Sequence, residues 1–484
     1  MKKEFILNIV LLLSINFLVK PLYLFGVDAH IQNIVGPQTY GVYFALFNLV
    51  FLFQFIIEPG IQSFNSRNIA QNPDQLGYHL PRILGIKMIL FLFFLAAIVV
   101  GFFATGYQSD LLPLVLWIGI NLFLSTTYIY LRTNIAAVGK YRIDSFLSAF
   151  DKLLMLIILG SLSWIPAFRE QFTIMWLVYG QFAAYLIACL VALFILRKHL
   201  GKISIVCSME YFQKLIKWSF PFILILLFMS IYNKMDGIML ERMLGDEGLE
   251  AGIYAAGYRF VDALNMIGYM MAALLLPMYS SNLKNSVVIT DLLHTGLKLI
   301  AVCAFVAACV FIFYGKDLLP LIYTEANAYY SEVLVYLMVS FIGVSVAYLY
   351  GSLLVANDNL KSFNILLAAS VLLNLGLNLY LIPLIEAKGA AIATAITQIT
   401  VLLGQVLLVY KYTEVRFQPK IYVQVLAFGL LCTLIFKGVQ QFSLFWMWGI
   451  AISISFSLIS ALILQLVEVR ALLAILKKRP TSDE

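Results

Sequence analysis

Charged residues inside long apolar stretches are the first sign of chemistry in this sequence, because such stretches rarely carry charge. Lys20 precedes a proline, Lys234 lies two residues before Asp236, and Arg259 lies three before Asp262. An ionisable side chain within a membrane-spanning helix costs a few kcal/mol and usually faces a cavity or a partner. Lysine binds phosphate oxygens as a point charge, and arginine binds them through its planar fork. Lys20, Lys234 and Arg259 therefore predict a substrate site for an anion, although Lys20 could instead snorkel to the membrane interface.

The carboxylates in these stretches predict a second kind of site, which would bind a coupling proton or sodium ion. Glu58 directly precedes Pro59 and Gly60. A buried carboxylate beside a helix break can bind such an ion. Asp236 and Asp262 are the other two candidates. Residues two apart do not share a helix face, so the lysine two positions before Asp236 need not neutralise it.

Two of these residues also have a purely structural interpretation, which the sequence leaves open. Glu58 could form an ion pair with Lys87 or Arg67 near the inner mouth of the protein. Arg259 could pair with Asp262, since residues three apart share a helix face. In either case the charge would stabilise the fold instead of binding a ligand.

The composition shows which solvent surrounds the helices that must position these residues. The 484 residues are 62% hydrophobic and 12% charged, with a mean hydropathy of +0.94. Soluble chains are about 45–50% apolar and about 25% charged. In lipid, only helices and closed barrels satisfy their backbone groups, and barrels alternate apolar with polar residues. Unbroken apolar runs such as 88–103 and 299–314 predict an all-α integral membrane protein instead.

The hydropathy pattern predicts about 14 transmembrane helices joined by short loops. A span needs about 20 mostly apolar residues. The longest loop, about 197–217, is basic, and residues 201–217 within it are predicted to form a cytoplasmic amphipathic linker. The predicted spans are 5–27, 40–64, 82–105, 110–131, 144–164, 172–196, 218–240, 252–279, 295–315, 329–353, 362–383, 389–410, 421–439 and 444–467.

An internal repeat divides these spans into two similar sets. Gly41-Val42-Tyr43-Phe44-Ala45 opens the second span, and Gly252-Ile253-Tyr254-Ala255-Ala256 opens the eighth. Segments 138–146 and 355–363 correspond at a similar offset. Six spans is an even number, so the two copies have the same orientation and are parallel repeats. We predict two six-helix bundles around a central cavity, at 1–200 and 218–412, followed at 413–484 by helices 13–14 and a cytoplasmic tail.

Charge distribution and missing motifs narrow the function further. Most of the 32 Lys and Arg residues fall in loops on one side, which predicts that both termini are cytoplasmic. This pattern indicates membrane orientation rather than nucleic-acid binding. The sequence has no phosphate loop, no metal-ligand spacing of histidines and no hydrolase motif. We therefore expect no catalytic residue, metal or cofactor, and a transporter rather than an enzyme.

Several short segments resemble a known family. Val35–Tyr43, Glu58-Pro59-Gly60, Ser66–Ala70 and Gly389–Thr394 are similar to segments of polysaccharide (O-antigen-type) flippases, within the multidrug/oligosaccharidyl-lipid/polysaccharide exporter superfamily. The resemblance implies alternating access by two bundles, with an undecaprenyl-diphosphate-linked oligosaccharide as cargo. It also implies that basic cavity residues meet the diphosphate, a role that Lys20, Lys234 and Arg259 match by position.

Three functions follow as hypotheses. The first is a flippase of the inner (cytoplasmic) membrane for surface polysaccharide biosynthesis, whose partners could include a glycan polymerase or glycosyltransferases. The alternative is an ion-coupled drug/cation antiporter of the same superfamily. Drug exporters often carry an acid near the proline of the first span, where this chain has Lys20, so the anionic cargo is favoured. The third is a membrane scaffold for glycan synthesis, in which cavity substitutions would be silent.

Overall fold

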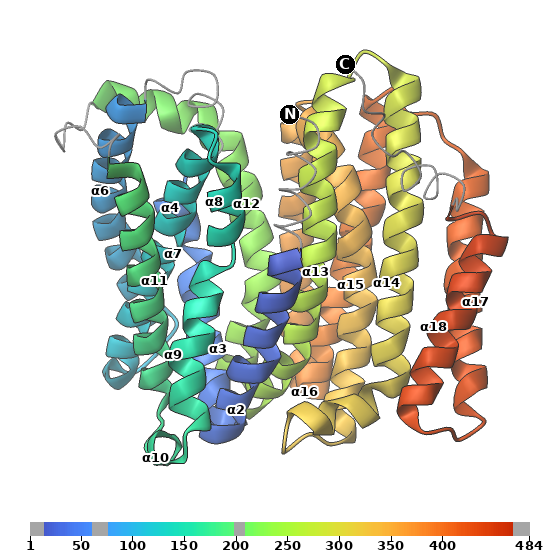
Figure 1. Ribbon diagram of the computed structural model, residues 1–484, viewed down its shortest axis with the longest axis horizontal. Helices are drawn as coiled ribbons and strands as arrows, with labels where there is room; N and C mark the ends of the chain where they lie inside the picture. The colour runs from blue at the N-terminus through green and yellow to red at the C-terminus, as the bar shows by residue number, and fades with distance from the viewer. Residues whose placement is uncertain (1–13, 61–75, 198–208, 468–484) are drawn as a thin grey trace, which may run out of the picture. The chain divides into compact units, whose positions relative to one another are not determined.

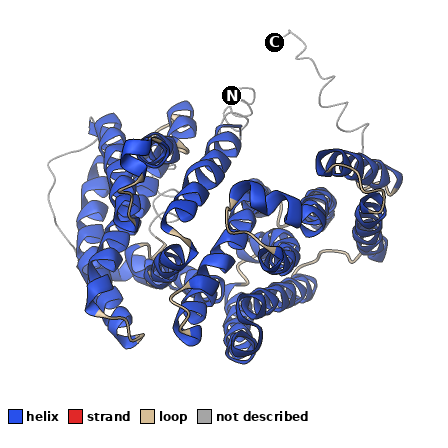
Figure 2. Cartoon of the chain, turned by 90° about the horizontal axis from the view of Figure 1, so that it is seen from below, coloured by secondary structure: helices blue, strands red, loops and turns tan. Residues whose placement is uncertain are grey.

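The computed structural model describes residues 14–60, 76–197 and 209–467 (Figure 1). Within these ranges every regular element is a helix, as Figure 2 shows, so the predicted all-helical fold class is confirmed. Eleven helices are long and apolar enough to cross a membrane, or up to twelve if a bent helix pair counts as one span. The chain is a multi-pass membrane protein.

The exact number of 14 spans is not confirmed, and α16 shows one reason. This helix, Leu360–Tyr412, has 53 residues and contains both predicted spans 362–383 and 389–410. At 1.5 Å per residue it would be about 80 Å long, more than twice the thickness of a hydrocarbon core. Its helical geometry breaks at Ile385 and at Glu386, where φ is 55°. The backbone N–H of Ala387, just after the break, donates to Glu250 Oε2 at 3.0 Å.

The first two predicted spans form the bent pair, and their sequence explains the bend. The first helix, Ser14–Val35, is followed by α3, Pro37–Leu52, and the chain bends by 119° between them. Gly36 joins them with a φ of 83°, a conformation that costs glycine little and other residues much more. Pro37 occupies the first position of α3, where its missing N–H is not needed. The first helix also contains a π-helical stretch, Leu24–Asp28, shortly after Pro21.

The chain divides into two compact units, which we describe separately. Unit 1 comprises residues 1–259, 322–325 and 371–390. Its apolar core packs Phe94 and Ile98 of α6 against Val115 of α7 and Val178 of α11. Its helices, after α3, are α4 Gln54–Ile57, α6 Leu76–Ala104, η3 Ser109–Leu111, α7 Leu112–Ala137, α8 Tyr141–Leu147, α9 Phe150–Trp164, α10 Pro166–Arg169, α11 Ile174–Leu196, α12 Met209–Leu244 and the start of α13 Leu249–Ser281.

Unit 2 comprises residues 260–321, 326–370 and 391–484. Its α17 and α18 pack against each other (Figure 1). Part of its polar interior is a chain of hydroxyl groups, in which Tyr422 contacts Tyr350 at 2.7 Å and Tyr410 at 2.6 Å. Besides its shares of α13 and α16, its helices are α14 Ser286–Ile322, α15 Ala328–Ala356, α17 Pro419–Gln440 and α18 Trp446–Ile463.

The domain boundaries expected from the repeat concern sequence relationships, whereas these units reflect spatial contact, so the boundaries remain predictions. The predicted linker 201–217 is described only from residue 209, where α12 begins. Residues 201–208 lie outside the described residues, as do Arg67, the Ser66–Ala70 segment and the tail from residue 468.

Candidate functional site

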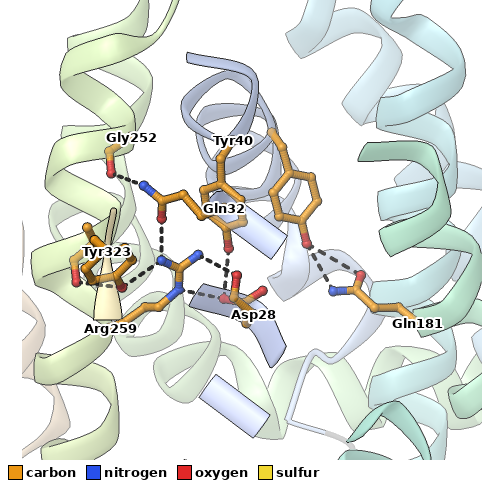
Figure 3. A network of polar contacts seen from close by, with 9 residues as sticks. Asp28, Gln32, Tyr40, Gln181, Gly252, Arg259 and Tyr323 are labelled. Atoms are coloured by element: carbon orange, nitrogen blue, oxygen red, sulfur yellow. Dashed lines mark hydrogen bonds and ion pairs between the residues drawn. The ribbon is translucent and has the colours of Figure 1, made fainter. Parts of the chain in front are cut away.

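Arg259 is the centre of a buried polar network in unit 1 (Figure 3). Its Nε donates to Asp28 Oδ2 at 2.6 Å, and its Nη1 donates to the Tyr323 hydroxyl at 2.9 Å and to Gln32 Oε1. The guanidinium carbon lies 4.3 Å from the centre of the Tyr40 ring. The Tyr40 hydroxyl in turn donates to Asp28 Oδ2 at 2.9 Å. The Arg259 side chain is only 5% exposed, so this network neutralises a buried charge.

The local fold explains why these groups meet. Asp28 and Gln32 are four residues apart on the first helix and share a face. The turn at Gly36 brings Tyr40 of α3 back toward that face. Arg259 reaches the same place from α13. The pairing thus depends on the bend between the first two helices, which a glycine–proline sequence produces.

The partner of Arg259 differs from the one that its sequence spacing suggested. Its ion pair is with Asp28, on another helix, whereas Asp262 has an exposed side chain. The hydropathy pattern predicted a first span that ends at residue 27, so Asp28 was not among the expected partners. The sequence feature that could have indicated this partner was a single carboxylate, Asp28, directly after an apolar run. The helix in fact continues to Val35, which places Asp28 inside the protein.

Lys234 lies in a different environment, among aromatic rings. Its ammonium is 5.3 Å from the centre of the Phe51 ring and 5.2 Å from that of the Tyr258 ring. The side chain is half-buried. Among the residues that the structure describes, no carboxylate lies within ion-pair distance of it. Favourable contact with ring faces stabilises the cation without neutralising its charge.

Lys20 belongs to a third environment, within the N-terminal helices. It is half-buried on the first helix, eight residues before Asp28, or about 12 Å along the axis. Asp151, Lys152 and Arg132 are the charged groups that act on it electrostatically. The structure therefore places Lys20, Lys234 and Arg259 in separate surroundings, and their joint role as a substrate site stays a prediction.

Lys152 is a half-buried cation that was not among the predicted site residues, and its contacts show how it is held. Its ammonium donates to the Tyr185 hydroxyl at 3.2 Å and lies 3.7 Å from Asp151 Oδ2. The centre of the Tyr23 ring is 5.0 Å away. Its contacts thus join the first helix, α9 and α11.

Asp236, a predicted coupling residue, is almost fully buried and is surrounded by hydrogen-bond donors. Its Oδ2 accepts from the Tyr254 hydroxyl at 2.7 Å. Its Oδ1 accepts from Asn378 at 2.6 Å and from Asn374 at 3.4 Å. Asn378 Oδ1 has no hydrogen-bond partner in the part of the chain that the structure describes. An unpartnered amide oxygen beside a carboxylate supplies the kind of ligands that a hard cation prefers.

Glu58, the second predicted coupling residue, forms a buried ion pair. Lys87 Nζ lies 2.9 Å from Glu58 Oε2 and 3.1 Å from the Ile57 carbonyl oxygen. The Lys87 side chain is 0% exposed. This is one of the two pairings that the sequence allowed, and it occurs within the N-terminal helices. A coupling role for Glu58 remains a prediction.

Polar amides in the spans also form the helix–helix hydrogen bonds that are usual for them in membranes. Asn121 of α7 donates to the Val178 carbonyl of α11 at 2.9 Å. Gln181 of α11, which is labelled in Figure 3, donates to the Tyr43 hydroxyl of α3 at 3.2 Å. In the described ranges, no three His, Cys, Asp or Glu side chains lie close enough together to hold a metal ion.

The fold defined by these helices is that of transporters of the MOP superfamily. It is similar to that of "Lipid II flippase MurJ, inward closed conformation", with a TM-score of 0.71 and 15% identity over 96% of this chain and 100% of that chain. The Vibrio cholerae MATE transporter VcmN matches with a TM-score of 0.59 and 14% identity over 84% of this chain and 94% of that chain. A MOP superfamily transporter from Pyrococcus furiosus, whose title describes a reverse polarity of its binding pocket, matches with a TM-score of 0.59. The identity is 12%, over 84% of this chain and 93% of that chain.

The sequence identifies the family more narrowly. The family model "Polysaccharide biosynthesis protein" matches residues 6–283, more than half of the chain. The chain belongs to this family, and the resemblance to polysaccharide flippases is confirmed. No curated protein matches the chain in sequence. The solved proteins with this fold carry titles that describe a flippase and transporters.

Proposed function

We propose that this chain is a flippase that translocates an undecaprenyl-diphosphate-linked oligosaccharide across the inner membrane by alternating access. Its family and its likeness to MurJ support a lipid-linked cargo. The observation that carries the anionic cargo is Lys234, a half-buried cation in a span with no carboxylate within ion-pair distance among the described residues. A cation in this situation attracts an anion and repels a cationic drug.

The three predicted cations would meet the diphosphate in a definite order. Arg259 is fully engaged by Asp28, Gln32 and Tyr323 in this conformation. Lys234 is therefore the cation that we expect the diphosphate to meet first. Arg259 would join only after a conformational change separates it from Asp28, and Lys20 would contribute from the N-terminal helices. Both termini would be cytoplasmic, and glycosyltransferases and a glycan polymerase would act before and after transport.

Replacement of Lys234 tests the cargo site. In a host lacking the chromosomal copy, Lys234→Gln is expected to lower glycan export at least tenfold, because a charge-assisted hydrogen bond contributes about 1.5–3 kcal/mol. Lys234→Arg keeps the charge and should retain part of the export. Lys361→Gln, at an exposed lysine, is the control. Full export by Lys234→Gln at normal protein level would remove the anion site.

The coupling ion is proposed to bind at Asp236, with Glu58 and Asp262 as the other candidates. The carboxylate of Asp236 and the amide oxygen of Asn378 favour this position, because both can supply oxygen ligands to a hard cation, whereas Glu58 already pairs with Lys87. Asp236→Asn removes the charge that attracts a cation. In proteoliposomes, transport by this variant should no longer respond to a sodium or proton gradient, whereas Glu58→Gln and Asp262→Asn should keep the response. A gradient response that survives in Asp236→Asn but not in one of the others would reassign the site.

The second candidate function is an ion-coupled drug/cation antiporter, favoured by the likeness of the fold to the transporter VcmN. It predicts that deletion sensitises cells to cationic dyes and leaves glycan export intact. The flippase predicts the opposite pair of results, so one deletion strain distinguishes the two functions.

A further inference from the structure

Unit 2 buries a histidine whose ring nitrogens have no hydrogen-bond partner among the residues that the structure describes. This residue, His294 of α14, is 3% exposed. In the same described ranges, the hydroxyl of Tyr279 of α13 is also without a partner, and its side chain is 0% exposed. A neutral imidazole carries one donor and one acceptor, and buried polar groups in proteins are nearly always hydrogen-bonded. Both side chains therefore indicate a polar ligand beside them.

The packing of three helices brings these two side chains to the same end of unit 2. A Cβ atom added to Gly296 of α14 would lie 3.2 Å from Leu275 of α13 and 3.4 Å from Leu349 of α15. Tyr279 lies one helical turn after Leu275, and His294 lies two residues before Gly296. Since α13 and α14 are consecutive helices joined by a short turn, both residues lie on the side of this contact that faces the turn.

The chain of tyrosine hydroxyls in unit 2 reaches the same place. The ring of Tyr422 lies 6.4 Å from that of His294, centre to centre and nearly perpendicular to it. In its bonds to Tyr350 and Tyr410, either hydroxyl can be the donor. Three hydroxyl hydrogens form two bonds, so one is left to donate elsewhere, and the direction of the chain can reverse. Tyr350 is 0% exposed and Tyr410 is half-buried, so the chain runs from the interior toward the surface.

We propose that these five residues form a proton-binding site centred on His294. We call it the histidine–tyrosine cluster and define it by Tyr279, His294, Tyr350, Tyr410 and Tyr422. Water is the bridging ligand, because it both donates and accepts and it spans gaps that are too long for a direct hydrogen bond. A ring nitrogen of His294 takes a proton from hydronium, which leaves water, and returns it by the same route. Reversal of the tyrosine chain lets the cluster donate to neutral His294 and accept from its protonated form.

The surroundings of the cluster suit reversible protonation. Asp291 and Lys298, on the same helix as His294, are the charged groups that act on it electrostatically, and their signs are opposite. The titratable groups that face it from α13, α15, α16 and α17 are the four tyrosines, which stay neutral near pH 7. His294 directly precedes the predicted span 295–315, at the end of that span that we predict to be cytoplasmic. The proton would therefore come from cytoplasmic water.

The protonation state of His294 can be measured directly. The chain has four histidines, and the other three, His30, His79 and His199, would be replaced with glutamine. Solid-state NMR of isotope-labelled imidazole nitrogens in the full-length protein, in lipid vesicles, then reports on His294 alone. Its signals should change from the neutral to the charged form as the pH falls from about 8 to about 5. A ring that stays neutral over this whole range is an inert core histidine, and the proposal is overturned.

Tyr422→Phe tests whether the tyrosine chain belongs to the site. It removes the hydroxyl that joins Tyr350 to Tyr410, so protonated His294 loses acceptors and its titration midpoint should fall by roughly half a pH unit or more. Tyr269→Phe makes the same change at an exposed tyrosine of α13 and should leave the midpoint unchanged. Equal midpoints in the two variants would overturn the cluster. If Tyr422→Phe does not fold, Tyr350→Phe takes its place. No cargo is measured, so the result is independent of the proposed flippase function.

Discussion

A Lys87→Met variant is expected to lose about 3–5 kcal/mol of unfolding free energy, because it leaves the carboxylate of Glu58 buried without its cation. The Lys87 side chain has no exposed surface, and the two charged groups are 2.9 Å apart. The ammonium also donates to the Ile57 carbonyl, which would lose that bond. The loss should appear as a large fall in the unfolding midpoint of the purified protein in detergent.

The double variant Lys87→Met/Glu58→Leu provides the first control. Replacing both charges with apolar groups of similar volume is often neutral or stabilising, so it should recover most of the loss. Arg132→Met provides the second control, because the Arg132–Asp144 pair is partly exposed and should contribute less. If the single and double variants are equally unstable, the methionine itself disrupts packing and the charge argument fails.

A Gly389→Val variant is expected to lose roughly 3 kcal/mol or more, because the new side chain overlaps the backbone. A Cβ at this position would lie 2.4 Å from the Leu381 carbonyl oxygen and 3.1 Å from the Ile382 nitrogen. The approach is close because α16 breaks at Ile385 and Glu386, so that residue 389 passes residue 381. Neither neighbour can move without shifting the helix that it belongs to.

Yield of folded protein and unfolding midpoint would measure this effect. Gly376→Val lies in the same helix and has the same intrinsic cost of replacing glycine, but a Cβ there meets no atom within 4 Å. The difference between the two variants therefore isolates the steric effect. Equal stability of the two would mean that the break in α16 accommodates a side chain at residue 389.

Some local features of the fold have a local cause in the sequence. The turn between the first two helices follows from glycine and proline at residues 36 and 37, which need no distant contact to act. The Glu58–Lys87 pair was one of two pairings that the sequence allowed. Span boundaries were less accurate: the first helix continues to Val35, and this extension moved Asp28 from an expected loop into the protein interior.

The candidate site was predictable in residue type but not in pairing. Arg259 was recognised as a buried cation, yet its partner Asp28 is 231 residues away in the chain. Lys234 and Asp236 are sequence neighbours, but one faces aromatic rings and the other faces hydroxyl and amide donors. The repeated glycines were visible in the sequence, whereas their mutual contact was not.

By itself, the sequence determined that this chain crosses the membrane as helices and belongs to a polysaccharide biosynthesis family. Whether a segment inserts into the bilayer as a helix depends on the composition of about 20 consecutive residues. The free energy of insertion can therefore be judged from neighbouring residues alone. Which cations pair with a carboxylate, among the described residues, was decided only by the tertiary structure. Ion pairing depends on distances of a few ångströms between residues of different helices, and spacing along the chain does not fix those distances.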